Sequence, residues 1–318
     1  MAEPLPRGAQ FKRAKTLWEI ALGVAGDPDI PYDGPRDICI SIGSGSGAQF
    51  KARFSMSVGS PELAYAVAKG EIDFGFVNPS GALTQAYLGK GMFKEPLPLR
   101  VVFSYPSWDR FLCMIHPRTG LTSLADIKDK RYPLRASIRE DKTHSTLVLI
   151  NQLFGMYGFS LDDLVSWGGS LQLNGPPMDP RRMAALREGT VDAVFDEGIG
   201  TWCGQALEAG FQLVAIDEPV LRQVTDLGWR QAILPKGWRP GVNEDHVCID
   251  YSGWPVYTRA SMPDNDVYQV LDALAARAGE VPWEDTFESV PKLGSDAEAT
   301  PLDVPLHPAA ERWYREHA

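Results

Sequence analysis

A glycine-rich turn constrains the fold of this chain more than any other stretch of its sequence. Residues 38–42 (Ile-Cys-Ile-Ser-Ile) have the apolar character of a buried strand, and residues 43–47 (Gly-Ser-Gly-Ser-Gly) follow directly. Alternate glycines let the backbone turn sharply and leave its N–H groups accessible. Residues 49–56 are then expected to form a helix whose partial positive end faces the turn. This arrangement predicts that a small anion or carboxylate binds there.

Two nucleotide-binding motifs can be compared with this turn. A phosphate-binding P-loop requires Lys followed by Ser or Thr after its last glycine, and no such pair follows here. A dinucleotide-binding turn can be aligned as Gly43-x-Gly45-x-x-Ala48, with Glu62 near the position of the ribose-binding acid. Glu62 lies in a Ser-Pro-Glu helix start rather than at a strand end, which disfavours that reading. The remaining alternative is that the glycines serve tight packing alone.

The size and charge of the chain limit its architecture and its partners. A length of 318 residues, 44% of them hydrophobic, is enough for two ordinary α/β lobes. The net charge is −10, and Lys and Arg do not cluster with exposed aromatic residues, so binding of nucleic acid or of an anionic membrane is not expected. No segment has the length of a membrane span, so no membrane insertion is predicted.

The four cysteines do not form a metal-binding pattern. Cys39, Cys113, Cys203 and Cys248 occur singly, without a Cys-x-x-Cys pair or a histidine at ligand spacing. They are expected to be small buried residues, and Cys39 lies within the apolar run of the first strand. The sequence leaves a disulfide open. Neither a metal nor another cofactor is predicted.

The N-terminal residues bear on location. Basic residues precede an apolar run, but Glu19 interrupts it, so we expect no cleaved signal peptide and a cytoplasmic protein. The location would be periplasmic if an export signal were missing from this sequence. Phe11, Lys15, Trp18 and Leu22 recur about one helical turn apart, which predicts an amphipathic helix packed on the body.

Strands and helices alternate along most of the chain. Such alternation is typical of parallel sheets with helices on both faces. Strands are expected at 72–77, 100–105, 111–116, 132–137, 164–167, 191–195, 211–216, 247–251 and 255–259, and helices at 61–69, 143–157, 181–188, 202–209, 263–278 and 308–315.

Six short stretches carry a family resemblance. They are Ile-Gly-Ser-Gly-Ser-Gly at 42–47, Gly-Ser-Pro-Glu-Leu at 59–63, Ala-Lys-Gly-Glu-Ile-Asp-Phe-Gly-Phe-Val at 68–77, Thr-Ser-Leu-Ala-Asp-Ile-Lys at 122–128, Leu-Arg-Glu-Gly-Thr-Val-Asp-Ala-Val-Phe at 186–195 and Pro-Leu-His-Pro-Ala-Ala at 305–310. Together they resemble the TAXI solute-binding proteins of tripartite ATP-independent (TRAP) transporters, which have the type II periplasmic-binding fold. No single stretch is diagnostic, but their succession is specific.

The resemblance implies an architecture and a ligand. It implies a two-lobed α/β clamp, each lobe a mixed, mainly parallel sheet flanked by helices. Residues 1–36 would be an N-terminal extension, 37–116 plus 240–318 the first lobe, and 117–239 the second. A small organic acid would bind in the cleft between the lobes, with hinge closure around it. A TRAP-type membrane permease would be the partner if the protein is exported.

The chain departs from the family pattern where it adds ionisable side chains. Family members commonly have small residues before the mid-chain helix, where this chain has Arg139 and His144. Asp196 and Glu197 follow the strand at 191–195, where small or apolar residues are usual. Family members are also exported, whereas no cleaved signal peptide is expected here.

The candidate ligand-binding residues lie at expected strand ends and nearby. Arg139 is the candidate for a bidentate carboxylate clamp, with a solvated surface charge as the alternative. Hydroxyl groups would contact the ligand or only cap helices, and aromatic rings would wall the cleft or only pack in the core. The candidates are Ser44, Ser46, Gly47, Asn78, Ser80, Trp108, Ser137, Arg139, Thr143, Trp202 and Tyr251.

Two functions are compatible with these residues. The first is a solute-binding protein that binds a small carboxylate without chemistry. The second is a cytoplasmic lyase, decarboxylase or isomerase on the same fold, in which Arg139 anchors the carboxylate and His144 exchanges protons with Asp196 or Glu197. The dipole of the helix at His144 would keep its imidazole neutral, and a purely structural histidine is the alternative. One of the two acids could instead cap the next helix.

Overall fold

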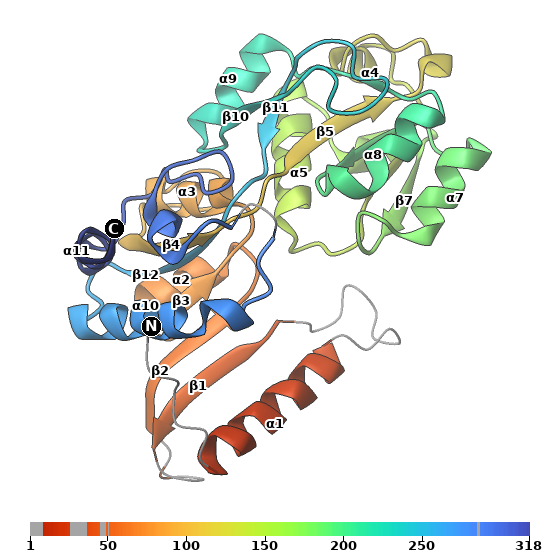
Figure 1. Ribbon diagram of the computed structural model, residues 1–318. Helices are drawn as coiled ribbons and strands as arrows, with labels where there is room; N and C mark the ends of the chain where they lie inside the picture. Colours follow the sequence, from red (N-terminus) through yellow and green to blue (C-terminus); the bar gives the residue numbers. More distant parts are fainter. Residues whose placement is uncertain (1–8, 26–36, 45–48, 50, 285–286) are drawn as a thin grey trace. The chain divides into compact units, whose positions relative to one another are not determined.

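The computed structural model describes residues 9–25, 37–44, 49, 51–284 and 287–318 (Figure 1). The chain divides into two compact units. Unit 1 comprises Met1–Tyr87, Pro96–Ser107 and Gly253–Ala318, and unit 2 comprises Leu88–Glu95 and Trp108–Ser252. The expected division placed the strands near 111–116 and 247–251 in the first lobe, whereas both belong to unit 2.

Unit 1 is built on a five-stranded sheet in the order β1-β2-β3-β12-β4. Among the described strand pairs of this sheet, β2–β3 is parallel and the other three are antiparallel. Its core joins the sheet to α10, α11 and a short 3₁₀ helix, η4. The elements are α1 (Ala9–Ala25), β1 (Cys39–Ser44), β2 (Lys51–Val58), α2 (Leu63–Lys69), β3 (Phe74–Phe76), α3 (Ser80–Leu88), β4 (Leu99–Tyr105), β12 (Trp254–Arg259), α10 (Asp264–Arg277), η3 (Ala278–Glu280), η4 (Val290–Gly294) and α11 (Pro308–His317).

The expectation of a helix at 49–56 is wrong, because β2 occupies most of this range. The residues alternate with a period of two, and Phe54 and Met56 pack against the core as same-face strand residues do. β1 and β2 therefore form an antiparallel hairpin, and residues 45–48 of the glycine turn lie outside the described ranges. Since a strand follows the turn, the helix-dipole argument for an anion there does not hold.

The expectation that the first strand is buried is also wrong. β1 is an edge strand: among the described strands, β2 is its one neighbour in the sheet. Ile40 and Ile42 are 37% and 48% exposed. Cys39 is exposed as well, contrary to the expectation that all four cysteines are buried.

Unit 2 is built on a seven-stranded mixed sheet in the order β10-β11-β5-β8-β6-β7, with β9 also paired to β5. β6 is parallel to β7 and β8, whereas β5 is antiparallel to β8, β9 and β11. The elements are β5 (Arg110–Ile115), η2 (Pro117–Thr119), α4 (Ala125–Asp129), β6 (Arg135–Arg139), α5 (Ser145–Tyr157), α6 (Leu161–Ser166), β7 (Ser170–Asn174), α7 (Pro180–Glu188), β8 (Ala193–Asp196), α8 (Ile199–Glu208), β9 (Gln212–Leu213), α9 (Glu218–Asp226), β10 (Gln231–Leu234) and β11 (His246–Asp250).

Helices cover both faces of this sheet. Successive side chains of β5 enter two different cores: Phe111 and Cys113 pack with α5 and α9, whereas Leu112 and Met114 pack with α8. Figure 1 shows the ribbons of α5 and α8 beside β5. The expected mixed α/β architecture with two sheets is therefore confirmed. Parallel pairs were expected to dominate, but antiparallel pairs are more numerous in both sheets.

A strand was expected at 164–167, but this stretch lies at the end of α6 and just beyond it. Ser160 and Asp163 form a capping box at the start of α6, which fixes the helix. The strand of this region is β7, a few residues later. No described helix combines the length and the apolar character that crossing a membrane requires.

The topology of unit 2 gathers charged residues at one edge of its sheet. The parallel strands β6, β7 and β8 all end at this edge. β5 runs the opposite way to β8 and β11, so its first residues lie at the same edge, where Arg110 is the register partner of Asp250. We call this group the charged edge. It consists of Asp109, Arg110, Arg139, Arg182, Asp196, Glu197 and Asp250.

Candidate functional site

Arg139 ends β6 and is surrounded by acceptors of its own unit. Its Nε donates to Oδ1 of Asp196 at 2.9 Å, and its Nη1 donates to the carbonyl oxygen of Gly175 at 2.5 Å. Its Nη2 donates to Oε1 of Glu197. The residue is only 2% exposed. The alternative of a solvated surface charge is therefore wrong, and the guanidinium is engaged with two carboxylates.

Asp196 also binds a second arginine that the sequence interpretation did not include. Arg182, on α7, forms an ion pair through Nη1 with Oδ2 of Asp196. Its Nε donates to Oγ of Ser137 at 2.9 Å, and its Nη1 donates to the carbonyl of Pro177 at 3.0 Å. Arg182 and Asp196 are both fully buried. Two guanidinium groups thus share one carboxylate.

Glu197 is held less firmly than Asp196. Asp196 accepts from Arg139, pairs with Arg182 and accepts from the backbone N–H of Glu197 at 2.9 Å. Within the described ranges, the carboxylate of Glu197 has Arg139 as its one side-chain partner, and the residue is 6% exposed. Of the two carboxylates that contact Arg139, Glu197 is therefore the one with fewer partners.

A second charged group lies at the start of β5. Asp109 accepts from the backbone N–H groups of Gly198 at 2.7 Å and Ile199 at 3.2 Å, so its carboxylate binds the N-terminal end of α8. Burial raises the pKa of Asp109 to about 7, and these N–H donors oppose the rise by stabilising the carboxylate. Arg110 binds Asp250 at 3.0 Å and is 1% exposed.

His144 is the N-cap of α5. Its Nδ1 accepts from the backbone N–H of Thr146 at 3.2 Å. Burial, followed by the positive charge of Arg139, lowers the pKa of His144 to about 4. The expectation of a neutral imidazole is therefore met, although burial rather than the helix dipole is the main cause. A neutral ring that accepts at Nδ1 carries its proton on Nε2.

Three other candidates of unit 2 are buried beside the charged edge. Ser137 accepts from Arg182 and from Asn174, whose Nδ2 lies 2.8 Å from its Oγ. Trp202 donates from Nε1 to the carbonyl of Glu197 at 2.7 Å. The hydroxyl of Tyr251 donates to Oγ of Ser145 at 2.6 Å. All three side chains are fully buried, and those of Ser137 and Trp202 form hydrogen bonds with members of the charged edge.

Two further candidates of unit 2 are more accessible. Trp108 is half-buried, and the guanidinium of Arg110 lies 4.3 Å from the centre of its ring. Thr143 is exposed, and its hydroxyl donates to Asp141 at 2.7 Å. Thr143 therefore contributes to the turn before α5 rather than to the charged edge.

The candidates of unit 1 do not belong to the charged edge. Ser44 ends β1, while Ser46 and Gly47 lie outside the described ranges. Asn78 follows β3, and its buried Oδ1 has no hydrogen-bond partner in the described part of the chain. Ser80 is buried at the start of α3.

Five residues at or beside the charged edge are not among the candidates from the sequence: Asp109, Arg110, Asn174, Arg182 and Asp250. Arg182 follows an Asp-Pro-Arg helix start, in which Asp179 is the N-cap, and the 3.6-residue periodicity of α7 could have placed Arg182 on its buried face. Asn174 was missed because the strand was expected at 164–167 instead of β7. Asp109 was read as part of a connection between strands, and no local pattern indicates that it binds α8.

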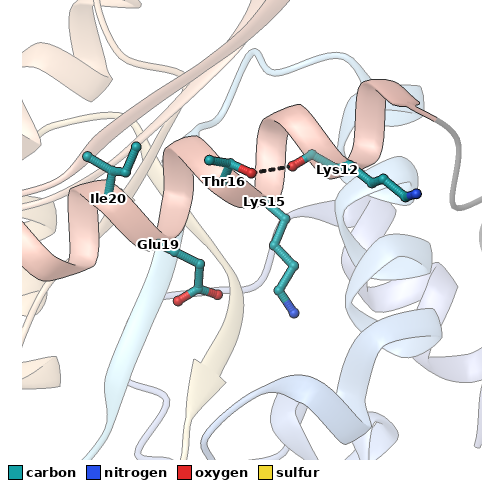
Figure 2. Close-up of a pocket in the computed structure, with 5 residues that line it drawn as sticks. All are labelled: Lys12, Lys15, Thr16, Glu19 and Ile20. Carbon is teal, nitrogen blue, oxygen red and sulfur yellow. Dashed lines mark hydrogen bonds between the residues drawn. The ribbon is translucent and has the colours of Figure 1, made fainter.

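A pocket on the N-terminal helix contains none of the expected site residues. It is lined by Lys12, Lys15, Thr16, Glu19 and Ile20 of α1 (Figure 2). Thr16 donates to the carbonyl of Lys12 at 2.9 Å, which is a contact within the helix. The described side chains of α1 are mostly exposed, so the expected packing of its apolar stripe on the body is not seen.

One protein family and several solved structures are similar to this chain. The NMT1-like family matches residues 36–317. The chain is similar to the alkanesulfonate-binding protein SsuA from Xanthomonas axonopodis pv. citri bound to MOPS, with 18% identity over 80% of this chain and 70% of that chain and a TM-score of 0.32. It is also similar to the glycine/betaine/L-proline-binding protein ProX from Borrelia burgdorferi, with 10% identity over 65% of this chain and 64% of that chain and a TM-score of 0.37. A third similar structure is the ATP phosphoribosyl transferase complex from Thermotoga maritima, with 12% identity over 86% of this chain and 94% of that chain and a TM-score of 0.33. Similarity at this level carries no argument about ligand or reaction.

Proposed function

The chain belongs to the NMT1-like family, and we propose that it is a solute-binding protein for a small organic carboxylate. The proposed binding site is the charged edge of unit 2. The proposal includes the finer type indicated by the six sequence stretches, a TAXI-type binding protein with a TRAP-type permease as partner if the protein is exported.

The observation that carries the proposal is that the two carboxylates bound by Arg139 differ in their number of partners. Asp196 is fixed by two arginines and a backbone N–H, whereas Glu197 depends on Arg139. An incoming carboxylate offers the same chemistry as Glu197 and can take over Nη2 of Arg139. Glu197 then moves to solvent, and Arg139 remains paired throughout.

The state of His144 argues for binding without chemistry. An acid–base role needs an imidazole nitrogen that can accept a proton from the ligand. The Nδ1 of His144 already accepts from Thr146, and the neutral ring carries its proton on Nε2. His144 therefore presents a hydrogen-bond donor, and it orients α5 as its N-cap.

The experiment is a proton NMR time course of the protein with pooled aliphatic and aromatic carboxylates, followed by calorimetric titration of the members that bind. Broadening of one acid without loss of its signal supports a binding protein. Consumption of an acid with the appearance of new resonances would contradict the proposal and favour the lyase, decarboxylase or isomerase. Absence of binding by every acid would also overturn it.

Substitutions of Arg139 and Glu197 test whether the ligand binds at Arg139. In Glu197→Gln, a neutral amide competes with the ligand about 1 kcal/mol less strongly than a carboxylate, so affinity should rise roughly fivefold. Arg139→Gln should lower affinity at least about tenfold, because the charge-assisted bond is lost. Arg222→Gln on α9 is the matched control, since Arg222 is 69% exposed and pairs within its own helix. Equal affinities in all three variants would place the ligand elsewhere.

A further inference from the structure

We infer that a second polar subsite, formed by Arg182 and Asn174 beside Arg139, binds a hydroxyl group of the ligand, so that the preferred ligands are hydroxycarboxylates. This inference rests on the proposed binding of a carboxylate at Arg139. It deepens that proposal by naming the class of acid.

Arg182 and Asn174 are fully buried, and each keeps one polar atom without a partner. Nη2 of Arg182 and Oδ1 of Asn174 have no hydrogen-bond partner among the described residues. Their other polar atoms are engaged, and both side chains donate to Oγ of Ser137, at 2.9 and 2.8 Å. The unpaired donor of Arg182 and the unpaired acceptor of Asn174 therefore belong to two side chains that both form a hydrogen bond with Ser137.

The strand register places these groups next to Arg139. Asn174 and Arg139 are partners in the parallel pair β6–β7, so their side chains lie on the same face of the sheet, and neighbouring strands are about 4.8 Å apart. Ser137 is two residues before Arg139 and shares this face. Arg182 and Arg139 are further joined through Asp196. We therefore expect a hydroxyl that binds these atoms to lie close to a carboxylate on Arg139, one or two carbons away along the ligand.

The chemistry of the two unpaired atoms selects the group that they bind. The guanidinium only donates, and the amide oxygen only accepts. A hydroxyl can accept from Nη2 and donate to Oδ1 with a single oxygen. An oxo group would leave Asn174 unpaired, and an ammonium group would leave Arg182 unpaired. A water molecule satisfies both atoms in the same way, and the ligand hydroxyl would take its place.

The test is calorimetric titration of the unaltered protein with matched sets of acids that differ at one carbon. The sets are lactate, propionate and pyruvate, and 3-hydroxybutyrate, butyrate and acetoacetate. Within at least one set, the hydroxy acid should bind at least about tenfold more tightly than both counterparts. Equal or tighter binding of the deoxy or oxo acid in both sets would overturn the inference and leave the carboxylate site standing. Absence of binding by every acid would overturn both proposals.

A substitution at Arg182 tests whether the preference for hydroxy acids arises from the subsite of Arg182 and Asn174. Arg182→Lys keeps the positive charge but removes the planar Nη2 donor, so the ratio of affinities for the hydroxy and deoxy acids should fall towards one. The control is Arg181→Lys at the adjacent, 57% exposed position of α7, which should keep the ratio of the unaltered protein. Circular dichroism shows whether each variant is folded. A folded Arg182→Lys protein with an unchanged ratio would contradict the assignment of the hydroxyl to Arg182.

Discussion

At the scale of single residues, four members of the charged edge form an internally neutralised group. Arg139 and Arg182 carry two positive charges, and Asp196 and Glu197 carry two negative charges, all at least nine-tenths buried. A buried pair of this kind adds little to stability when it is complete, but removing one partner leaves the other charge unpaired. The group is therefore vulnerable to single substitutions.

Arg139→Gln should lower the free energy of unfolding by about 3–5 kcal/mol, because the buried Glu197 would lose its arginine partner while Asp196 keeps only Arg182 of its two arginines. Denaturant unfolding followed by circular dichroism measures this loss. Arg222→Gln should change stability by less than about 0.5 kcal/mol, since its pair is exposed. If the two variants were equally stable, the ion pairs of Arg139 would not be structural.

The stability of the protein should depend on pH through His144. Its pKa is about 4 in the folded protein and about 6.5 in an unfolded chain, so the unfolded chain binds the additional proton between these values. The contribution of His144 to stability is therefore full above about pH 6.5 and is lost as the pH drops towards 4, by about 3 kcal/mol. The raised pKa of Asp109 acts in the opposite direction over the same range, so the His144 contribution is measured as a difference between variants. The measurement is urea unfolding at a series of pH values.

The variant for this measurement is His144→Asn, since asparagine is also a good N-cap and keeps α5. It should lose less stability than the unaltered protein between pH 6.5 and 4. His317→Asn at the exposed C-terminus is the control and should retain the original pH dependence. Parallel curves for the unaltered protein and His144→Asn would show that another group is responsible.

Part of the site could be predicted because it follows a general rule of α/β sheets. Arg139, Asp196 and Glu197 stand at the ends of strands that the apolar pattern identifies, where functional groups gather. The pairing of Arg139 with Asp196 and Glu197 could not be predicted, since it depends on β6 and β8 being neighbours. Arg182 reaches the same carboxylate from a helix, and only the tertiary structure brings it there.

At the scale of elements, glycine determines how closely β3 approaches β12. Gly75 is the register partner of Tyr257, which is fully buried. A Cβ atom at position 75 would lie 2.4 Å from Cζ of Tyr257 and 2.6 Å from its hydroxyl oxygen. The ring can therefore lie across the strand only because residue 75 has no side chain.

Gly75→Ala should destabilise the protein by about 1–3 kcal/mol, because Tyr257 or the strand must shift to accommodate the methyl group. Gly155→Ala is the opposite case. Gly155 is exposed within α5, and a Cβ there meets nothing within 4 Å, so this variant should gain about 0.5–1 kcal/mol. Thermal and denaturant unfolding of both variants gives the comparison, and a neutral Gly75→Ala would contradict the close packing.

The sequence identifies most elements of this fold but not all of their types. α5 and α10 were predicted from a 3.6-residue apolar period, which the side chains themselves carry. β2 was mistaken for a helix because the glycine turn before it was interpreted as a helix start, although the alternation of residues 51–58 indicated a strand. The relative direction of the strands could not be predicted either, because the register and the neighbours of each strand depend on contacts between residues far apart in the sequence.

At the scale of the whole molecule, the cysteines report on the integrity of both units. Cys39 is exposed in unit 1, whereas Cys113, Cys203 and Cys248 are buried in unit 2, and all four are free. Burial raises the pKa of Cys203 and Cys248 to about 12 and that of Cys113 further still. The buried thiols are therefore both inaccessible and protonated.

Ellman's reagent should modify one thiol rapidly in the native protein and all four in denaturant. The single fast thiol should disappear in Cys39→Ser, which serves as the control for its assignment. More than one fast thiol at neutral pH would show that unit 2 opens readily in solution. No fast thiol would contradict the exposure of Cys39.

The antiparallel course of β5 has a consequence for how the site is made. Arg110, at the first residue of β5, meets Asp250 across 140 positions of sequence, and Arg139 meets Asp196 across 57. Contacts between such distant positions require long loops to close, which costs entropy and slows folding. A nascent or refolding chain can therefore form its local helices before the charged edge is assembled, so these ion pairs should be among the later contacts to appear.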